Sequence, residues 1–454
     1  MSPKLRETFA SLQVRNFRLF AEGQVVSLTG TWMQRVAQDW LVLQLSHDSG
    51  TAIGVVTALQ FLPILLFGLY GGVLADRFDK RLLLRVANAS MLLCALTLGI
   101  LDATGVVQLW HVYALAFLLG LASVLDTPVR HSFVGELVPR DVLPNAVSLN
   151  SAVFNSARIV GPAVAGVMIT TIGTASVFFV NAASYVLVYV NLNRMNQDEL
   201  YLRTPDDDET PSRIREGFDY IRRSPHLLAP ILLVAWIGMF GFNFQITTAL
   251  MAKLQFHRNA ASYGLLGTCL ATGSLVGALL AARRVPRPRV YIGAGIIFGL
   301  MEVACGLMPN YLSLALILIP TGLVILTFTT GANAILQVRS EPRLRGRVAS
   351  FYVFAFLGGS PIGAPLIGWI GGRYGPRWPL IVGGGLCAFG ALAAGLYLLR
   401  PHLLRVGARR PAGITQSPRA AVVPRVAAAE ADDSEDAQAA AVADVAEVAA
   451  AAPR

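Results

Sequence analysis

Charged residues are scarce in this chain, because Asp, Glu, Lys and Arg make up only 14% of its 454 residues. A water-soluble domain carries about 25% charged residues, so this chain has too few to cover a surface that faces water. Hydrophobic residues make up 54% of the chain. They form runs of about 20 residues, the length that crosses a bilayer core as a helix. We therefore expect a polytopic membrane protein.

Cysteine is also rare, and the four residues have no paired spacing and lie inside apolar runs: Cys94, Cys269, Cys305 and Cys387. We interpret them as small core residues rather than disulfides or metal ligands. The sequence has no Gly-x-x-x-x-Gly-Lys-Ser/Thr loop and thus no ATP-binding motor of its own. It also shows no His/Asp/Glu or Ser/His cluster at one interface. We expect neither an enzyme nor a metal or cofactor site.

The apolar runs define the predicted fold class. In lipid, a single segment satisfies all its backbone groups only as a helix. The sequence therefore predicts an all-α membrane protein with twelve transmembrane helices, over residues 17–45, 52–75, 83–101, 109–129, 146–170, 174–192, 227–250, 261–282, 290–308, 311–331, 348–370 and 378–399.

The positive charge is unevenly distributed between the two sides of these spans. If the spans alternate in direction, nearly all arginines fall on one side, and the opposite side holds only Lys253, Arg258, Arg373 and Arg377. By the positive-inside rule, both termini are cytoplasmic. The net charge of +10 therefore reports topology, and we expect no nucleic-acid partner. Abundant arginine and alanine beside scarce lysine is typical of a GC-rich bacterium, which predicts the bacterial plasma membrane.

Related segments recur on either side of the polar insert 193–226. Aligning "NAVSLNSAVFNSARIVGPAVAGVM" with "GRVASFYVFAFLGGSPIGAPLIGWI" pairs Gly161 with Gly363 and Gly166 with Gly368. Aligning "SHDSGTAIG" with "FHRNAASYG" pairs His47 with His257 and Gly54 with Gly264. Two duplicated six-span halves are typical of alternating-access transporters, which bind substrate between the halves.

This repeat predicts the domain organisation. Residues 1–192 form an N-terminal six-helix bundle, 193–226 a cytoplasmic central loop and 227–400 a pseudo-symmetric C-terminal six-helix bundle. Residues 401–454 are rich in alanine and proline and lack the apolar pattern of a core. We expect them to form a disordered cytoplasmic tail.

The segment "GGVLADRFDKR" follows the second span and places an acid and several cations in a tight turn. It resembles the loop 2–3 signature of the major facilitator superfamily, G-x-L-A-D-R-x-G-R-K, with Asp79 in place of the usual glycine. In that family the motif is a gating latch between the halves on the cytoplasmic side. The resemblance implies this role for Gly72, Asp76, Arg77, Lys80 and Arg81. The cations can also bind acidic helix ends and lipid phosphates. Alternatively, these charges only enforce topology.

A second motif, "ARIVGPAVAG", lies in the fifth span. It resembles the GPxxGG element associated with antiporters in the same superfamily, although Val167 replaces the second glycine. The matching residues are Arg158, Gly161, Pro162 and Gly166. The alternative is plain packing of small residues, which is common between membrane helices.

Four ordered segments carry a wider resemblance: "GTWMQRVAQDWLVLQLS", "QFLPILLFGLYGGVLADR", "LDTPVRHSFVGELVP" and "NAVSLNSAVFNSARIVGPAVAG". Together they resemble the enterobactin-exporter-like group, also called transmembrane secretion effectors, over most of residues 10–400. The resemblance implies the major facilitator fold and proton-driven efflux of siderophores, drugs or other hydrophobic metabolites. It does not fix the substrate.

Ionisable residues within the spans need a reason, because each costs about 2.5–3.5 kcal/mol at the centre of a membrane helix. Asp39 and Arg35 are one turn apart and can pair. Burial favours a neutral Asp39 and Arg35 favours its carboxylate, so Asp39 is the first candidate for proton coupling. Glu302 is a further candidate or a buried hydrogen-bonded acid. A static structural pair is the alternative for Asp39 and Arg35.

Two other charged groups are assigned differently. Asp126 and Arg130 have the same spacing near the cytoplasmic end of the fourth span, and we interpret them as partners of Arg77 rather than substrate ligands. Arg158 has no acid in its own helix and can meet Asp39, Asp126 or an anionic substrate.

Polar residues within the spans are candidates for the substrate cavity or for contacts between helices: Gln34, Gln38, Asn150, Asn155, Asn243, Gln245, Asn333 and Gln337. Some aromatic side chains can stack on a flat substrate or simply pack: Trp32, Trp40, Phe240, Phe242 and Phe244.

The sequence thus predicts a monomeric efflux transporter whose partners are a small-molecule substrate, protons and membrane lipid. Uptake of a small metabolite, proton-coupled or facilitated, is compatible with the same fold. A non-transporting sensor or receptor with a transporter fold is the alternative of another class, although residues 401–454 do not resemble a signalling domain.

Overall fold

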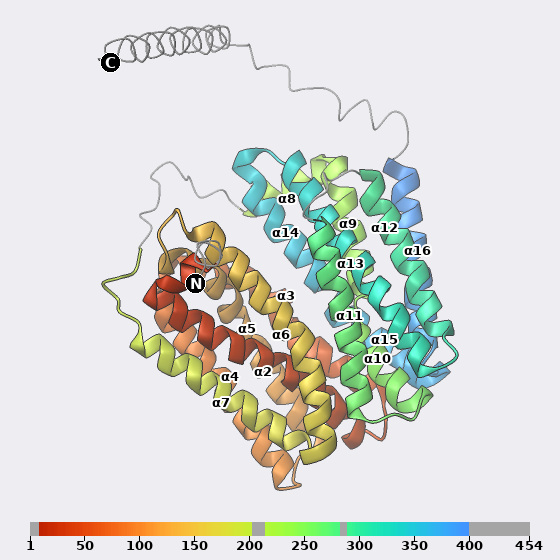
Figure 1. Ribbon diagram of the computed structural model, residues 1–454. Helices are drawn as coiled ribbons and strands as arrows, with labels where there is room; N and C mark the ends of the chain where they lie inside the picture. Colours follow the sequence, from red (N-terminus) through yellow and green to blue (C-terminus); the bar gives the residue numbers. More distant parts are fainter. Residues whose placement is uncertain (1–8, 202–213, 282–287, 399–454) are drawn as a thin grey trace, which may run out of the picture. The chain divides into compact units, whose positions relative to one another are not determined.

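The computed structural model describes residues 9–201, 214–281 and 288–398, and every regular element among them is helical (Figure 1). The first half contains η1 (Ala10–Gln13), α2 (Arg15–Leu45), α3 (Gly50–Arg77), α4 (Lys80–Ala103), α5 (Leu109–Leu137), α6 (Leu143–Ile172) and α7 (Thr174–Arg194). The second half contains α8 (Ile214–Arg223), α9 (Pro225–Phe240), α10 (Phe244–Leu250), the π-helical turn η2 (Met251–Gln255), α11 (Ala260–Ala281), α12 (Pro288–Leu307), α13 (Tyr311–Arg339), η3 (Pro342–Leu344), α14 (Arg345–Gly358), α15 (Ser360–Tyr374) and α16 (Trp378–Leu398). The predicted tail, 401–454, lies outside the described residues.

The all-α membrane fold predicted from the sequence is confirmed. Within the described residues, eleven helical segments are long and apolar enough to cross a membrane. The remaining predicted span is α2, whose 31 residues extend about 46 Å at 1.5 Å per residue. Its less apolar composition has a structural reason, because four of its polar side chains are buried in the protein: Gln24, Gln34, Gln38 and Asp39.

Two predicted spans are interrupted where they contact each other. The span 227–250 divides into α9 and α10, and the Asn243 side chain donates to the Met239 carbonyl at 2.8 Å. The span 348–370 divides into α14 and α15 at Gly359, just before Pro361. A Cβ atom at Gly359 would lie 2.7 Å from the backbone nitrogen of Met239. The glycine lets the two spans approach each other closely, and the glycine and proline together interrupt the helix.

The packing of the first six spans recurs in the last six. In the first half, α2 packs on α6 and α7, α4 packs on α5 and α7, and α3 packs on α5. In the second half, α9 packs on α14 and α16, α12 packs on α13 and α16, and α11 packs on α13. Taken in chain order, these are the same pairs, so the sequence repeat is accompanied by a structural repeat.

The two halves meet chiefly where α3 packs on α15 and α6 packs on α11. Gly54 and Gly264, which the sequence repeat aligns, make equivalent contacts here. A Cβ atom at Gly54 would overlap the carbonyl oxygen of Ala364, and one at Gly264 would overlap that of Pro162. The absence of a side chain therefore sets the distance between the halves at both places. We call the end of the molecule that carries connections 46–49 and 256–259 the 46–49 face.

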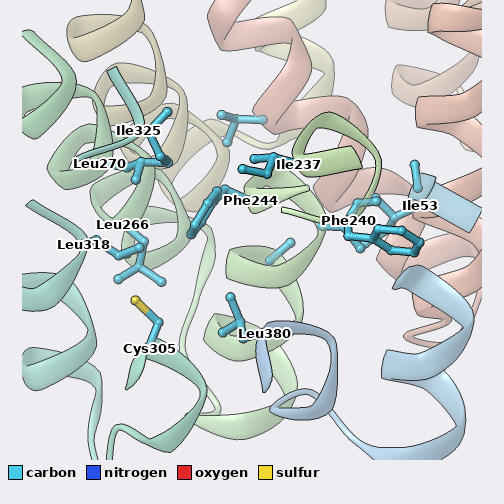
Figure 2. Close-up of a cluster of buried hydrophobic side chains, with 14 of the residues drawn as sticks. Ile53, Ile237, Phe240, Phe244, Leu266, Leu270, Cys305, Leu318, Ile325 and Leu380 are labelled. Carbon is cyan, nitrogen blue, oxygen red and sulfur yellow. The ribbon is translucent and has the colours of Figure 1, made fainter. Parts of the chain in front are cut away.

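A cluster of buried apolar side chains extends through both halves. Figure 2 shows part of it around the interruption between α9 and α10, with Ile53 of α3 beside Phe240. Phe240 and Phe244 are 8% and 6% exposed. These two rings belong to the packed core, which is the second of the two roles considered for them from the sequence.

Replacing Gly54 by alanine tests the helix contact. The added methyl group would overlap the Ala364 oxygen and lie 2.8 Å from Pro365 Cα, so we expect a destabilisation of about 1–3 kcal/mol. Thermal unfolding of the purified protein in detergent measures it. The matched control is Gly68→Ala in the same helix, where the nearest atom is a Cγ2 of Ile64 at 3.6 Å; its midpoint should not fall. Equal midpoints for the two variants would contradict the proposed contact.

Candidate functional site

A buried acid of α2 links the two halves. Asp39 is 5% exposed, and its Oδ2 accepts a hydrogen bond of 2.8 Å from the Tyr263 hydroxyl of α11. Trp40 stacks on the Tyr263 ring with 6.4 Å between centroids. A hydroxyl that donates to an ionised carboxylate forms a charge-assisted bond, stronger than one between neutral groups. Because Tyr263 belongs to α11, the hydrogen-bond partner of Asp39 lies in the opposite half.

An ion pair lies beside this contact. Lys253 Nζ of η2 is 2.5 Å from Asp48 Oδ1 and 5.3 Å from the centre of the Trp40 ring. Two further hydrogen bonds join the halves between α6 and α11, from the Thr268 hydroxyl to the Ile159 carbonyl (3.0 Å) and from the Ala261 amide to the Thr170 hydroxyl (3.2 Å). Together these contacts hold the halves together toward the 46–49 face.

The connections at this face have matching backbone turns. His47 and Asp48 have φ values of 52° and 68°, and His257 has 49°. Non-glycine residues rarely adopt this left-handed region, so its use at aligned positions marks the repeat in the backbone. Sequence reasoning missed the roles of Asp48, Lys253 and Tyr263. The available signal was the repeat itself, because Asp48 and Tyr263 lie within it and Lys253 lies just before it.

The expected pairing of Arg35 with Asp39 is not present. The ion pairs among described residues do not include it, because the two side chains lie against different neighbours. Helical side chains lean toward the N-terminus, and the Arg35 guanidinium carbon lies 4.7 Å from the centre of the Trp32 ring, one turn earlier. Asp39 instead contacts Tyr263. Separation by one turn allowed the pair but did not determine it.

Arg158 of α6 lies near the same indole, with its guanidinium carbon 5.8 Å from the Trp32 ring centre. It forms no ion pair with either Asp39 or Asp126. The approach of α6 to α2 depends on Gly161, since a Cβ atom there would lie 2.5 Å from the Trp32 Cβ. The structure thus brings Arg35 and Arg158, predicted for separate motifs, to one aromatic side chain.

Asp126 and Arg130 form the pair that their spacing predicts, with 3.3 Å between Arg130 Nε and Asp126 Oδ2. Arg130 also donates to the Gln24 side chain of α2 at 3.1 Å. Both of these contacts of Arg130 join helices or residues of the first half. Arg77, their expected partner, is exposed at the end of α3.

The 71–81 segment is anchored to two helix ends of the first half. The Asp79 carboxylate accepts from the Arg81 amide at 2.9 Å and caps α4. Asp79, which replaces the usual glycine of the motif, therefore has a structural use. Lys80 pairs with Glu136 of α5. Arg81 is buried and donates to the last carbonyls of α7, those of Leu192 (2.5 Å) and Asn193 (2.9 Å).

A Cβ atom added to Gly72 would meet no atom within 4 Å. The side chain of Asp76 lies outside the described residues. The gating role of the motif therefore remains a prediction.

The second motif forms part of the contact between the halves. Gly166 faces α11, where a Cβ atom would lie 2.8 Å from the carbonyl oxygen of Ala260. Pro162 contacts Gly264 and Gly267 of the same helix. Gly161, in contrast, faces α2 within its own half. The motif thus allows close packing on two sides of α6.

Glu302 lies apart from the other charged residues. It is 1% exposed, and its Oε2 has no hydrogen-bond partner among the described residues. Its side chain lies beside Gly383 and Gly384 of α16, so it belongs to the α12–α16 contact. Among the described residues, no group of three His, Cys, Asp or Glu side chains is placed to hold a metal ion.

The predicted cavity residues differ in their hydrogen-bond partners and in their burial. Gln34 accepts from Asn181 of α7 at 2.5 Å, which makes it a contact between helices of one half. Asn155 and Asn243 donate to carbonyls of their own chain segments, and Gln337 donates to Asn333 one turn earlier at 3.2 Å. Gln38 is buried, whereas Asn150 and Gln245 are half-buried.

Comparison with known proteins identifies related sequences over most of the chain. Residues 6–412 match the family described as transmembrane secretion effector. An uncharacterised MFS-type transporter of Bacillus subtilis, YfiS, is 27% identical over 77% of this chain and 86% of its own length. The multidrug efflux pump Tap of Mycobacterium tuberculosis is 26% identical over 76% and 84%. The staphyloferrin A transporter of Staphylococcus aureus is 24% identical over 61% and 68%.

Solved structures show the same fold at low sequence identity. A bacterial homologue of the human lysosomal transporter Spinster, in an inward-facing and occupied conformation, has a TM-score of 0.67 at 13% identity, over 84% of this chain and 95% of that one. A bacterial homologue of the iron transporter ferroportin has a TM-score of 0.64 at 13% identity, over 85% and 99%. The sequence match over residues 6–412 and the shared fold lead to one conclusion: the chain belongs to the transmembrane secretion effector family of major facilitator superfamily transporters.

Proposed function

We propose that the chain exports a small amphipathic molecule across a bacterial plasma membrane in exchange for protons, by alternating access. Its family supplies the transporter class, and its similarity to the multidrug efflux pump Tap supports export. The observation that carries the proton coupling is the hydrogen bond between Asp39 and Tyr263, because it places a buried acid at the contact between the halves.

The distribution of positive charge supports the proposed orientation. Arginines gather at the end of the molecule opposite the 46–49 face, for example Arg77, Arg194 and Arg339 at the ends of α3, α7 and α13. The positive-inside rule makes that end cytoplasmic, together with both termini. The 46–49 face is then the outer face, and its contacts form a closed outer gate.

The two moving bodies are residues 1–192 and 227–400, joined by the cytoplasmic loop 193–226. The 71–81 segment, where α3 ends and α4 begins, is the inner gate in this scheme. Lys80 and Arg81 anchor its turn to α5 and α7, so the motif moves together with the first half.

Asp39 acts as the lock of the outer gate. Its carboxylate accepts the Tyr263 hydroxyl, and this bond is stronger for a charged acceptor than for a neutral one. Without a bound proton, the transporter therefore stays closed to the outside. In this state it loads substrate from the cytoplasm, and it does not cycle empty. Once the gate opens, Asp39 is accessible from outside and takes up a proton. The protonated acid bonds Tyr263 more weakly, and release of that proton to the cytoplasm restores the lock.

Replacing Asp39 by asparagine tests the coupling. Asparagine keeps the size of the side chain but cannot carry a proton, so we expect accumulation in everted vesicles to fall to the level seen without a pH gradient. The assay uses fluorescent compounds of each charge class: ethidium, Nile red and fluorescein. Asp102→Asn is the matched control, since that carboxylate accepts from Thr174 within the first half. Gradient-driven accumulation that survives Asp39→Asn would remove Asp39 from this role, and native transport without gradient dependence would indicate facilitated diffusion.

Replacing Tyr263 by phenylalanine tests the lock itself. The change removes a hydroxyl donor to a charged acceptor, a bond of about 1.5–3 kcal/mol. We therefore expect proton leak through proteoliposomes without substrate to rise by about tenfold or more, followed with a pH-sensitive dye. Tyr311→Phe is the control, because that hydroxyl donates to the Ser262 carbonyl within the second half at 2.9 Å. An equal leak in both variants would refute the lock.

A further inference from the structure

Two cations of the first half lie at one aromatic side chain. The guanidinium carbons of Arg35 and Arg158 are 4.7 Å and 5.8 Å from the centre of the Trp32 ring. Phe154, one turn before Arg158, meets the same ring edge-on at 6.2 Å between centroids. We call Trp32, Arg35, Phe154 and Arg158 the Trp32 cluster. It combines two hydrogen-bonding cations with an aromatic surface.

The cluster is positioned by the helix contact rather than by its own charges. Two guanidinium groups repel each other, so their proximity requires a constraint from the fold. Gly161 provides it, because the absence of a side chain there allows α6 to lie against the Trp32 Cβ. Arg158 is one turn before Gly161, and this places it on the side of α6 that faces the indole.

The cations of the cluster are not engaged in ion pairs with described carboxylates. Asp39 accepts from Tyr263, and Asp126 pairs with Arg130. Neither Arg35 nor Arg158 forms an ion pair with a described acid. A cation within a membrane helix is costly, and cation–π contact offsets only part of that cost. The side chains of Trp32, Arg35 and Arg158 are half-buried and Phe154 is exposed, so the cluster is not sealed within the apolar core.

We propose that the Trp32 cluster binds the acidic group of the transported molecule, and that the substrate is an aromatic or other planar acid. The guanidinium groups would bind a carboxylate or a similar anion, since arginine presents several donors to such groups in a fixed geometry. Trp32 and Phe154 would contact its planar part. This inference rests on the proposed transport function, because it names the chemical class that the transporter carries.

The cluster also explains how substrate opens the outer gate. Arg35 is one turn from Asp39, and its positive charge stabilises the Asp39 carboxylate. An anion bound at Arg35 offsets that charge and adds a like charge near Asp39. Both effects destabilise the carboxylate that accepts from Tyr263. Binding of the acid from the cytoplasm thus weakens the lock, whereas a neutral compound of the same shape leaves it intact.

A matched pair of probes tests the proposal on the native chain. We expect the purified full-length protein in lipid nanodiscs to bind 2-naphthoate at least about tenfold more tightly than the neutral 2-naphthamide, as measured by titration calorimetry, because only the acid gains charge-assisted hydrogen bonds. Equal affinities for the two probes, or no binding of either, would overturn the proposal.

Variants locate the site. Arg158→Gln should abolish the preference for the acid, and Arg158→Lys should retain part of it, since lysine keeps the charge but not the planar fork. The matched control is Arg258→Gln, which removes a cation 5.7 Å from the Tyr311 ring centre and should leave the preference unchanged. A preference that survives Arg158→Gln, or is lost equally in Arg258→Gln, would overturn the assignment.

This binding assay does not depend on proton coupling. If the acid binds as expected but its export from vesicles ignores a pH gradient, the coupling proposal fails and the anion site stands. If gradient-driven export is found only for compounds without an acidic group, the coupling stands and the anion site is wrong.

Discussion

The close approach of glycine-bearing helix surfaces is the constraint on which the rest of this structure depends. In a bilayer, apolar side chains gain little by leaving lipid for protein, so helices associate where small residues let their backbones meet. Gly54 meets Ala364, and Gly264 meets Pro162 at the repeat-related position. These contacts place α2 and α11 close enough for Asp39 to accept from Tyr263. The hydrogen bond between Asp39 and Tyr263 is thus a consequence of apolar packing.

Three groups of charged residues inside the first half have different kinds of partner. Asp126 pairs with Arg130, Asp39 accepts a hydroxyl, and Arg35 and Arg158 lie at an indole. Of these three arrangements, only the first is an ion pair. In the proposed cycle, a proton alters the charge of the second group and an anion that of the third.

The sequence determined the fold and the location of the charged residues, but not which side chains meet. Apolar runs predicted the helices, because a single segment in lipid satisfies its backbone groups only as a helix. Repeated glycines predicted the duplicated order, because the repeat is visible in the sequence itself. The Asp39–Tyr263 contact joins residues 224 positions apart, and no local pattern encodes it. The Arg35–Asp39 pair was expected from spacing alone, yet side-chain direction and the neighbouring helix placed Arg35 at Trp32 instead. The interruptions at Asn243 and Gly359 depend on a contact between distant helices and were missed for the same reason.

Those interruptions make the two halves mechanically unequal. α2 and α6 are continuous over 31 and 30 residues, whereas their counterparts in the second half are each divided, and the divisions touch at Met239 and Gly359. An uninterrupted helix resists bending along its length, while a divided one yields at the gap. In the proposed alternating-access cycle, the first half, which holds Asp39 and the Trp32 cluster, therefore keeps its internal geometry, and the second half bends at its two gaps.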